Sequence, residues 1–275
     1  MYLSSLRVEV GTDSASEYPG QRWLRNIYHV HQRLCMAFPS AADRQDGADG
    51  DHVHGRRGLD AGFLFRIDPG RDGRPVILVQ SASKPSWECA FYNARHFLVD
   101  PGPDRDPWEV KPFDLTFNAG QRLRFRLLAN PTKKIGSIRQ EERQRHTKEE
   151  LRQIEGRNGR RVPVPSSEEL RAWREKNPEG DERMFISLRV IDWLAEWRVR
   201  PDESPGFCID KDSTTVQAGY IYVNKTRDGK GQRLRSVRYD GILEVTDPDK
   251  FRNTLLRGIG PGKGFGFGLL SVASC

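Results

Sequence analysis

The chain is poor in the residues that build metal and disulfide sites. Its 275 residues include only four cysteines, which lie far apart and form no CxxC pair. This spacing argues against a zinc ribbon, an iron–sulfur site and a disulfide scaffold. His52 and His54 have no carboxylate pattern around them. We therefore expect no metal site and no cofactor.

Long apolar runs are missing as well. No stretch approaches the ~20 apolar residues that cross a bilayer. The first residues, MYLSSLRVEV, lack the charged and apolar regions of a signal peptide. We expect a soluble cytoplasmic protein without membrane contacts. The 6 Trp and 13 Phe argue against disorder.

Several common catalytic motifs are absent. The sequence contains no GxSxG, no HExxH, no paired acids of the DxD type and no EF-hand loop. A nuclease with this sequence would have no obvious ligands for a two-metal mechanism. Its chemistry would then depend on His and Tyr side chains.

Positive charge, by contrast, is concentrated in one segment. The whole chain carries 45 Lys and Arg against 38 Asp and Glu, a net charge of +7. Residues 121–161 alone carry thirteen basic residues against five acids, so the rest of the chain has a net charge of −1. Ion pairs on a solvated helix explain residues 139–155. They do not explain the acid-free flanks at 122–134 and 157–161, which favour a polyanion such as nucleic acid.

The hydrophobic patterns predict an α+β protein of two tandem ferredoxin-like (βαββαβ) domains. We expect the first domain to cover residues 1–118, with strands at 1–10, 63–67, 76–80 and 108–117 and helices at 21–38 and 86–97. We expect the second to cover residues 119–275, with strands at 123–129, 216–224, 234–245 and 267–272 and helices at 166–176, 184–195 and 247–257. A short extended piece is expected at 160–165.

A glycine run, GIGPGKGFGFG, separates the last helix from the last strand. It fits neither the Walker A loop nor the dinucleotide-binding fingerprint. Its alternating glycines allow positive φ angles and the close approach of another backbone or of a phosphodiester. The alternative is a long turn packed on neighbouring strands. Lys263 within the run favours phosphate contact.

Tyr28 and His31 lie three residues apart in a predicted helix, so they share one face, whereas His29 points elsewhere. Such a pair can place a phenol and an imidazole at one reacting centre. The alternative is that His31 is a surface or core histidine without a catalytic role.

Together these segments resemble the CasE family. CasE proteins are the CRISPR RNA-processing endoribonucleases of the type I-E Cascade complex and members of the RAMP superfamily. The resemblance runs in order from residue 1 to about 273 and is carried by the following segments: MYLS, IYHVHQRLCMAFP, FLFRID, VILVQSASKP, LRFRLLANPTKK, RRVPV and GILEVT…LLRGIGPGKGFGFGLLSVA.

The resemblance implies roles for individual residues. Tyr28 and His31 match the catalytic tyrosine and histidine of the family, in a Y-x-x-H-Q pattern completed by Gln32. The resemblance also places RNA-binding residues in a basic hairpin (Lys133, Arg160 and Arg161) and in the glycine-rich loop (Gly260, Lys263, Gly264 and Gly266). Arg157, in the acid-free flank at 157–161, is a further candidate for RNA binding. Segments 41–60 and 137–180 are longer than in shorter family members. The resemblance therefore does not assign which basic residues of 139–152 contact RNA.

The activity that the resemblance implies is metal-independent cleavage of precursor CRISPR RNA at the 3′ base of each repeat hairpin. The 2′-OH attacks the adjacent phosphate and leaves a 2′,3′-cyclic phosphate and a 5′-OH, and the product stays bound. The implied partners are the repeat hairpin and other Cascade subunits, with the free protein a monomer. Two alternatives are a non-catalytic RNA-binding scaffold of the same fold and a basic module that binds a protein or an anionic metabolite.

Overall fold

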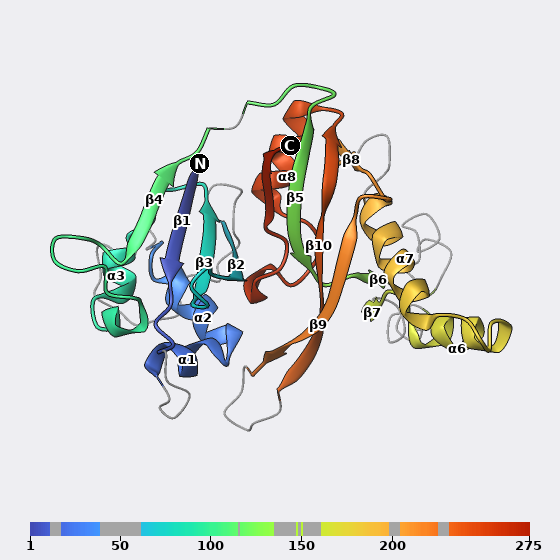
Figure 1. Cartoon of the computed structure of the whole chain (residues 1–275), viewed down its shortest axis with the longest axis horizontal. Coiled ribbons are helices and arrows are strands. Elements are labelled where there is room, and N and C mark those ends of the chain that lie inside the picture. Colours follow the sequence, from blue (N-terminus) through green and yellow to red (C-terminus); the bar gives the residue numbers. More distant parts are fainter. Residues whose placement is uncertain are drawn as a thin grey trace.

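A computed structural model describes residues 1–11, 18–38, 62–114, 116–134, 147, 150, 161–197, 204–224 and 231–275. Two antiparallel sheets lie side by side, with the helices Ser167–Lys176 and Glu182–Ala195 on the outer side of the second sheet (Figure 1). In this described part, no helix is long and apolar enough to cross a bilayer.

The first sheet has the strand order of a ferredoxin-like fold, β2-β3-β1-β4. Its strands are β1 (Tyr2–Arg7), β2 (Phe63–Pro69), β3 (Pro75–Ser81) and β4 (Trp108–Pro112). Its helices are α1 (Pro19–Leu24), α2 (Ile27–Cys35), α3 (Trp87–Phe91) and the short 3₁₀ helix η3 (Arg95–Phe97). The predicted helix at 86–97 is therefore a shorter α-helix followed by a separate 3₁₀ turn.

The single helix predicted at 21–38 is wrong, because the chain breaks into α1 and α2 at Asn26. Asn26 has an extended conformation, and its side-chain oxygen accepts a hydrogen bond from the Tyr28 backbone N–H at 3.2 Å. Asn is a preferred N-cap because this bond satisfies a donor that the helix leaves unpaired. Asn26 thus caps a new helix that begins at Ile27, one residue before Tyr28.

The second sheet has the same ferredoxin-like order, β11-β5-β10 followed by β8 and β9. Its strands are β5 (Arg122–Ala129), β8 (Phe207–Ile209), β9 (Thr215–Val223), β10 (Gln232–Val245) and β11 (Leu270–Ser274). Its helices are α6 (Ser167–Lys176), α7 (Glu182–Ala195), α8 (Pro248–Arg257) and the 3₁₀ helix η4 (Lys263–Phe265). The two tandem ferredoxin-like folds are confirmed, although the last strand begins at Leu270 and not at Phe267.

Strands β8 and β9 share the edge of β10. β8 pairs with the end of β10, Leu243–Val245. β9 pairs with the earlier part of β10, Gln232–Asp240. The long β9–β10 ribbon reaches the first domain (Figure 1), where Val223 belongs to the core of that domain and Ile221 and Leu234 pack against it. The apolar alternation of β9 therefore serves two cores.

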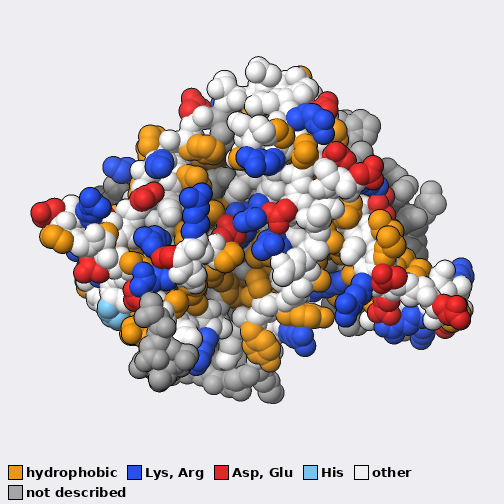
Figure 2. Space-filling model, viewed as in Figure 1, with side chains coloured by type: hydrophobic (Ala, Val, Ile, Leu, Met, Phe, Trp, Pro, Cys, Tyr) orange, Lys and Arg blue, Asp and Glu red, His pale blue; other side chains and the backbone are white. Residues whose placement is uncertain are grey.

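Buried polar side chains also join the two sheets. Arg66 of β2 donates to the backbone carbonyls of Arg126 and Leu269, each at 3.1 Å. Gln80 of β3 donates to the carbonyl of Leu255 in α8 at 2.6 Å. Near these bonds between the sheets, Asp240 forms ion pairs with Arg126 and Arg238. On the face of the molecule drawn in Figure 2, positive and negative side chains are intermixed near the middle. Asp240 therefore offsets part of the positive charge of the two arginines.

Candidate active site

Tyr28 and His31 lie on α2, three residues apart, as the helical periodicity predicts. Tyr28 is half-buried and packs against the first core, while His31 is buried, with 5% of its surface exposed. His29, between them, is exposed and lies 3.2 Å from the Asn26 side chain through Nε2. The structure thus separates the two predicted catalytic side chains from the neighbouring histidine.

The imidazole of His31 is held by aromatic rings and by a thiol. It stacks near Phe63 and Phe65 of β2, with ring centroids 5.5 and 6.1 Å apart. The Sγ atom of Cys35, one helical turn further on, lies 3.6 Å from Nε2. These contacts fix the plane of the ring, which a group that transfers protons at one atom requires.

The glycine run from Gly258 to Gly268 forms a tight loop around η4. Five of its six glycines have positive φ angles between 70° and 90°, and Gly264 is the exception. The loop is anchored where the Gly268 N–H donates to Leu128 O at 2.8 Å and the Ile259 N–H donates to Gly268 O at 3.0 Å. The alternation of glycines therefore reflects backbone conformations that other residues rarely adopt.

This loop lies against α2. A Cβ atom placed on Gly264 would be 3.5 Å from Nε2 of His31, and one on Gly266 would be 3.7 Å from Ile27 and 3.4 Å from Phe65. On the other side of the loop, a Cβ on Gly260 would be 3.1 Å from Trp193 of α7. The structure therefore brings His31 together with Gly264, at the seam between the two domains.

The basic hairpin is a separate pair of strands, β6 (Thr132–Lys134) and β7 (Arg161–Pro163). The indole N–H of Trp193 donates to Thr132 O at 3.2 Å, so α7 connects the hairpin to the glycine loop. Arg161 donates to the Thr132 hydroxyl at 3.2 Å and is exposed. Two further predicted RNA-binding residues, Arg157 and Arg160, lie outside the described residues, as do 139–146 and 151–156 of the basic segment.

Lys133 is held in place by an acid that the sequence patterns did not single out. Its ammonium lies 3.0 Å from the carboxylate of Glu169, which also binds Arg189 at 3.2 Å and accepts from the Ser166 N–H at 2.8 Å. Burial by itself raises the pKa of Glu169. The Ser166 N–H and the two cations outweigh burial and lower that pKa to about 2. Glu169 thereby ties the hairpin to the first turn of α6.

The surroundings of His31 include residues that sequence reasoning missed. Cys35 could have been found, since it lies four residues after His31 on the same helix face. Phe63 and Phe65 carried no such signal, because they reach His31 from a strand more than thirty residues away in the sequence.

The arrangement is suited to proton transfer at a substrate that enters beside the glycine loop. His is the side chain whose ordinary pKa lies nearest neutral pH, and Tyr28 offers a phenol on the same helix face. Within the described ranges, no three His, Cys, Asp or Glu side chains are grouped to hold a metal ion. His52 and His54 lie outside those ranges.

Comparison with known proteins gives consistent matches along the whole chain. The sequence model of a family described as "CRISPR associated protein" matches residues 1–274. The CRISPR-associated endoribonuclease Cse3 of Thermus thermophilus is 30% identical over 99% of this chain and 100% of its own length. The CRISPR system Cascade subunit CasE of Escherichia coli is 24% identical over 91% of this chain and 94% of its own length.

Solved structures agree with these matches. Thermus thermophilus Cse3 bound to an RNA representing a pre-cleavage complex superposes with a TM-score of 0.62 and 26% identity. The match covers 99% of this chain and 98% of that one.

Proposed function

Since this chain belongs to the CRISPR-associated protein family, we propose that it is an endoribonuclease that cleaves precursor CRISPR RNA within each repeat. The cut falls at the 3′ base of the repeat hairpin, and the mature CRISPR RNA stays bound. The observation that carries this proposal is the position of His31, which lies three residues after Tyr28 on α2 and beside Gly264 of the glycine loop. The 30% identity to a protein named as an endoribonuclease supports the same activity.

Cleavage proceeds by transesterification within the RNA. The 2′-OH before the scissile phosphate loses its proton and attacks phosphorus in line, while the 5′-oxygen of the next nucleotide leaves and gains a proton. The products are a 2′,3′-cyclic phosphate and a 5′-OH. Because the nucleophile belongs to the RNA itself, the reaction needs no metal to generate it.

His31 carries a proton in this reaction, either as the base at the 2′-OH or as the acid at the leaving oxygen. Tyr28 donates a hydrogen bond to the nucleophile or to the phosphate. The backbone beside Gly264 admits the phosphodiester, and Lys263 in the same loop offsets the charge that develops on it. A positioned acid or base contributes about 10²–10⁴-fold to the rate.

Substrate selection depends on the shape and backbone of the hairpin. The deep major groove of A-form RNA hides the base edges, so contacts to phosphates dominate. The basic hairpin supplies them through Lys133, Arg157, Arg160 and Arg161, and the glycine loop adds Gly260 and Gly266. Binding therefore weakens as salt rises. The bound product joins the protein to the other subunits of a Cascade complex.

We also propose that the boundary between the two domains lies between residues 118 and 119. The last strand of the first sheet ends at Pro112, and the first strand of the second begins at Arg122.

One assay tests the activity. The full chain is incubated with its repeat RNA in EDTA, beside the same RNA with a 2′-deoxy nucleotide before the cut. We expect cleavage of the first RNA and none of the second. Cleavage of the deoxy RNA, or a requirement for Mg²⁺, would contradict the mechanism. RNA binding without any cleavage would instead indicate a non-catalytic scaffold.

The site assignment has a matched control on the same helix. We expect His31→Ala to lower the cleavage rate by at least about 10²-fold, with RNA affinity retained. His29→Ala removes an exposed histidine two residues earlier and leaves the rate unchanged. An active His31→Ala variant would overturn the site but not the family.

A further inference from the structure

Two tyrosines stand exposed on the outer face of the β9–β10 ribbon. Tyr220 and Tyr222 are 61% and 63% exposed, although they lie within a paired strand. Being two residues apart on a strand, they project on the same side. Large aromatic side chains exposed together on a rigid strand point to a binding surface.

The strand opposite supplies two arginines to the same face. Arg235 is paired with Tyr220, and Arg233 is paired with Tyr222. The Arg233 guanidinium lies 3.6 Å from the centre of the Tyr220 ring, a cation–π contact. Along this face the other residues of β9 and the nearby part of β10 are Val216, Ala218, Val237 and Tyr239, so these strands add no acid to it.

The surface formed by Tyr220, Tyr222, Arg233 and Arg235, here called the tyrosine–arginine surface, lies between the two parts of the proposed RNA site. Arg235 donates to Val164 O at 3.1 Å, next to the end of the basic hairpin. On the opposite face of β9, Ile221 and Val223 pack on the first core. The Asn26 side chain, which caps the catalytic helix, donates to Asn224 O at 2.9 Å.

We propose that the tyrosine–arginine surface binds unpaired nucleotides that flank the repeat hairpin, by stacking their bases on Tyr220 and Tyr222. This inference rests on the proposed function. Tyrosine rings stack on bases of any sequence, and arginine pairs with the phosphates between them. Only unpaired bases can be reached in this way, because bases within the stem already stack on each other. The positive charge beside the rings fits a nucleic acid better than an apolar protein segment.

The surface would hold the strand that enters or leaves the cleavage site. RNA bound on this face of β9 lies one layer away from α2, because the opposite face of β9 contacts the first core beside that helix. Binding there adds affinity for the precursor without adding a group to the reacting atoms. The tyrosines therefore affect RNA affinity, while the rate at saturating RNA depends on Tyr28 and His31.

The test measures RNA affinity by fluorescence anisotropy with the full chain. The RNAs are the bare hairpin, the hairpin with only a 5′ flank and the hairpin with only a 3′ flank. The RNA with the 3′ flank carries a 2′-deoxy nucleotide before the cut, so that it stays intact during the measurement. For the double variant Tyr220→Ala/Tyr222→Ala we expect a loss of about tenfold per stacked base, for one or both flanked RNAs. The affinity for the bare hairpin stays within twofold.

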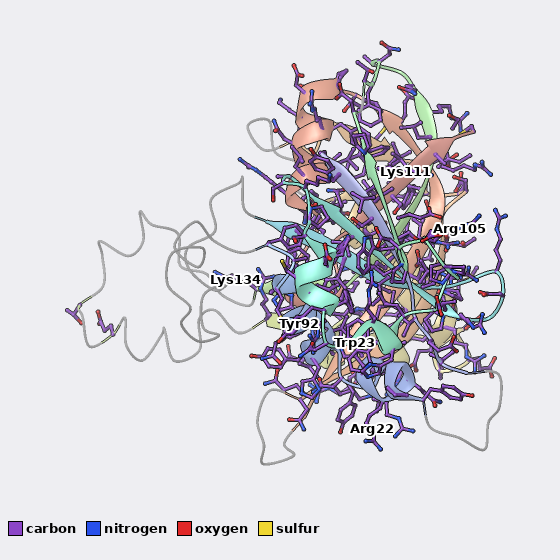
Figure 3. The ribbon with its side chains drawn as sticks, turned by 90° about the vertical axis from the view of Figure 1, so that its left-hand side faces the viewer. Arg22, Trp23, Tyr92, Arg105, Lys111 and Lys134 are labelled. Carbon is purple, nitrogen blue, oxygen red and sulfur yellow. The ribbon has the colours of Figure 1, made fainter. Side chains whose placement is uncertain are left out.

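Two further variants separate stacking from folding. Tyr220→Phe/Tyr222→Phe keeps the rings, so it retains the affinity of the original protein for flanked RNA. Tyr92→Ala removes a tyrosine that is 72% exposed at the end of α3, on the side that faces the viewer in Figure 3. This control leaves the affinities for all three RNAs unchanged.

The outcomes are distinguishable from a failure of the proposed function. If the original protein does not cleave repeat RNA, the enzyme proposal fails, while anisotropy still reports on the tyrosines. Equal losses for bare and flanked hairpins, or no loss for either, would overturn the flank-binding proposal. In single-turnover cleavage with the protein in excess, we expect Tyr220→Ala/Tyr222→Ala to need a higher protein concentration for the half-maximal rate. The maximal rate stays unchanged.

Discussion

At the scale of single residues, Gly264 controls the space beside His31. Its φ angle is not positive, unlike those of the other five glycines of the loop, so alanine fits its backbone. The added methyl group would lie 3.5 Å from Nε2 of His31, an ordinary van der Waals distance. In the proposed mechanism, the methyl group thus takes up space that the phosphodiester needs, without breaking the fold.

We therefore expect Gly264→Ala to lower the cleavage rate by roughly ten- to hundredfold, since small misplacements at a reacting centre cost about that much. Its melting temperature stays within about two degrees of the original. Single-turnover cleavage and thermal unfolding measure the two effects. Gly62→Ala is the matched control, because a Cβ there meets no atom within 4 Å.

Gly266→Ala, unlike Gly264→Ala, is expected to lower the stability of the fold. Its φ of 79° disfavours alanine, and the new methyl group would press on Phe65 at 3.4 Å. We expect a loss of about 1 kcal/mol or more in the free energy of unfolding.

For Gly264→Ala, one result would contradict the prediction. If this variant cleaves RNA at the original rate, the substrate does not approach His31 from the glycine loop.

Single residues also show what a sequence can predict about a site. The pairing of Tyr28 with His31 follows from helical spacing, and Cys35 follows the same spacing. The aromatic wall of Phe63 and Phe65 does not, since it depends on which strand the helix covers. The distinct role of Gly264 among six glycines appears only with backbone angles.

At the scale of elements, the α6 helix is held to the basic hairpin by one carboxylate. Glu169 closes a capping box with Ser166 and at the same time binds Lys133 and Arg189. The pKa of Glu169 is lowered to about 2, below the value of about 4.5 expected for the unfolded chain. A lowered pKa stabilises the folded state above pH 4.5, and this contribution is lost as pH falls from 4.5 towards 2.

The variant Glu169→Gln removes this contribution. Near neutral pH we expect it to lower the free energy of unfolding by about 1–2 kcal/mol. This is less than the full pKa shift of Glu169 corresponds to, because solvent screens the partly exposed carboxylate. The difference from the original protein shrinks between pH 4.5 and pH 3. Urea unfolding at several pH values measures it.

Glu168→Gln serves as the control for this titration, since Glu168 is an exposed acid in the same helical turn. It leaves the stability difference nearly constant over that pH range. A stability difference for Glu169→Gln that does not change with pH would show that the ion pairs of Glu169 contribute nothing.

Elements differ in how far local sequence determines them. The caps at Ser166 and Asp247 were predictable, because both residues bind backbone N–H groups within their own first turn. The break between α1 and α2 was not, since the Asn26 side chain that starts α2 also bonds to Asn224, almost two hundred residues away. The reach of β9 into the first core has the same long-range origin.

At the scale of the whole molecule, the two domains must stay in register for the site to exist. His31 belongs to the first domain and Gly264 to the second. The strand order within each sheet could be predicted from the βαββαβ pattern, which repeats along the chain. The joint could not, because it depends on single polar side chains such as Arg66 in an otherwise apolar strand.

Arg66 makes four hydrogen bonds at this joint while almost fully buried. It binds both carboxylate oxygens of Asp68, at 2.8 and 2.7 Å, in addition to the carbonyls of Arg126 and Leu269 in the second domain. Removing one partner of a buried ion pair leaves the other charge uncompensated, which is far more costly than replacing the whole pair. The two carbonyls would also lose the hydrogen bonds that Arg66 donates to them.

We expect Arg66→Met to lower the free energy of unfolding by about 3–5 kcal/mol. The double variant Arg66→Met/Asp68→Asn recovers part of this loss, since it also removes the unpaired charge, but the hydrogen bonds from Arg66 to the two carbonyls stay lost. Because the lost contacts hold β2, which carries Phe63 and Phe65 against His31, cleavage by Arg66→Met falls even at temperatures where the protein is folded.

Chemical unfolding and single-turnover cleavage at 10 °C measure the two losses. The control is Arg71→Met, in the exposed turn between β2 and β3. Equal stability of Arg66→Met and Arg71→Met would show that the hydrogen bonds of Arg66 contribute nothing to holding the two domains together.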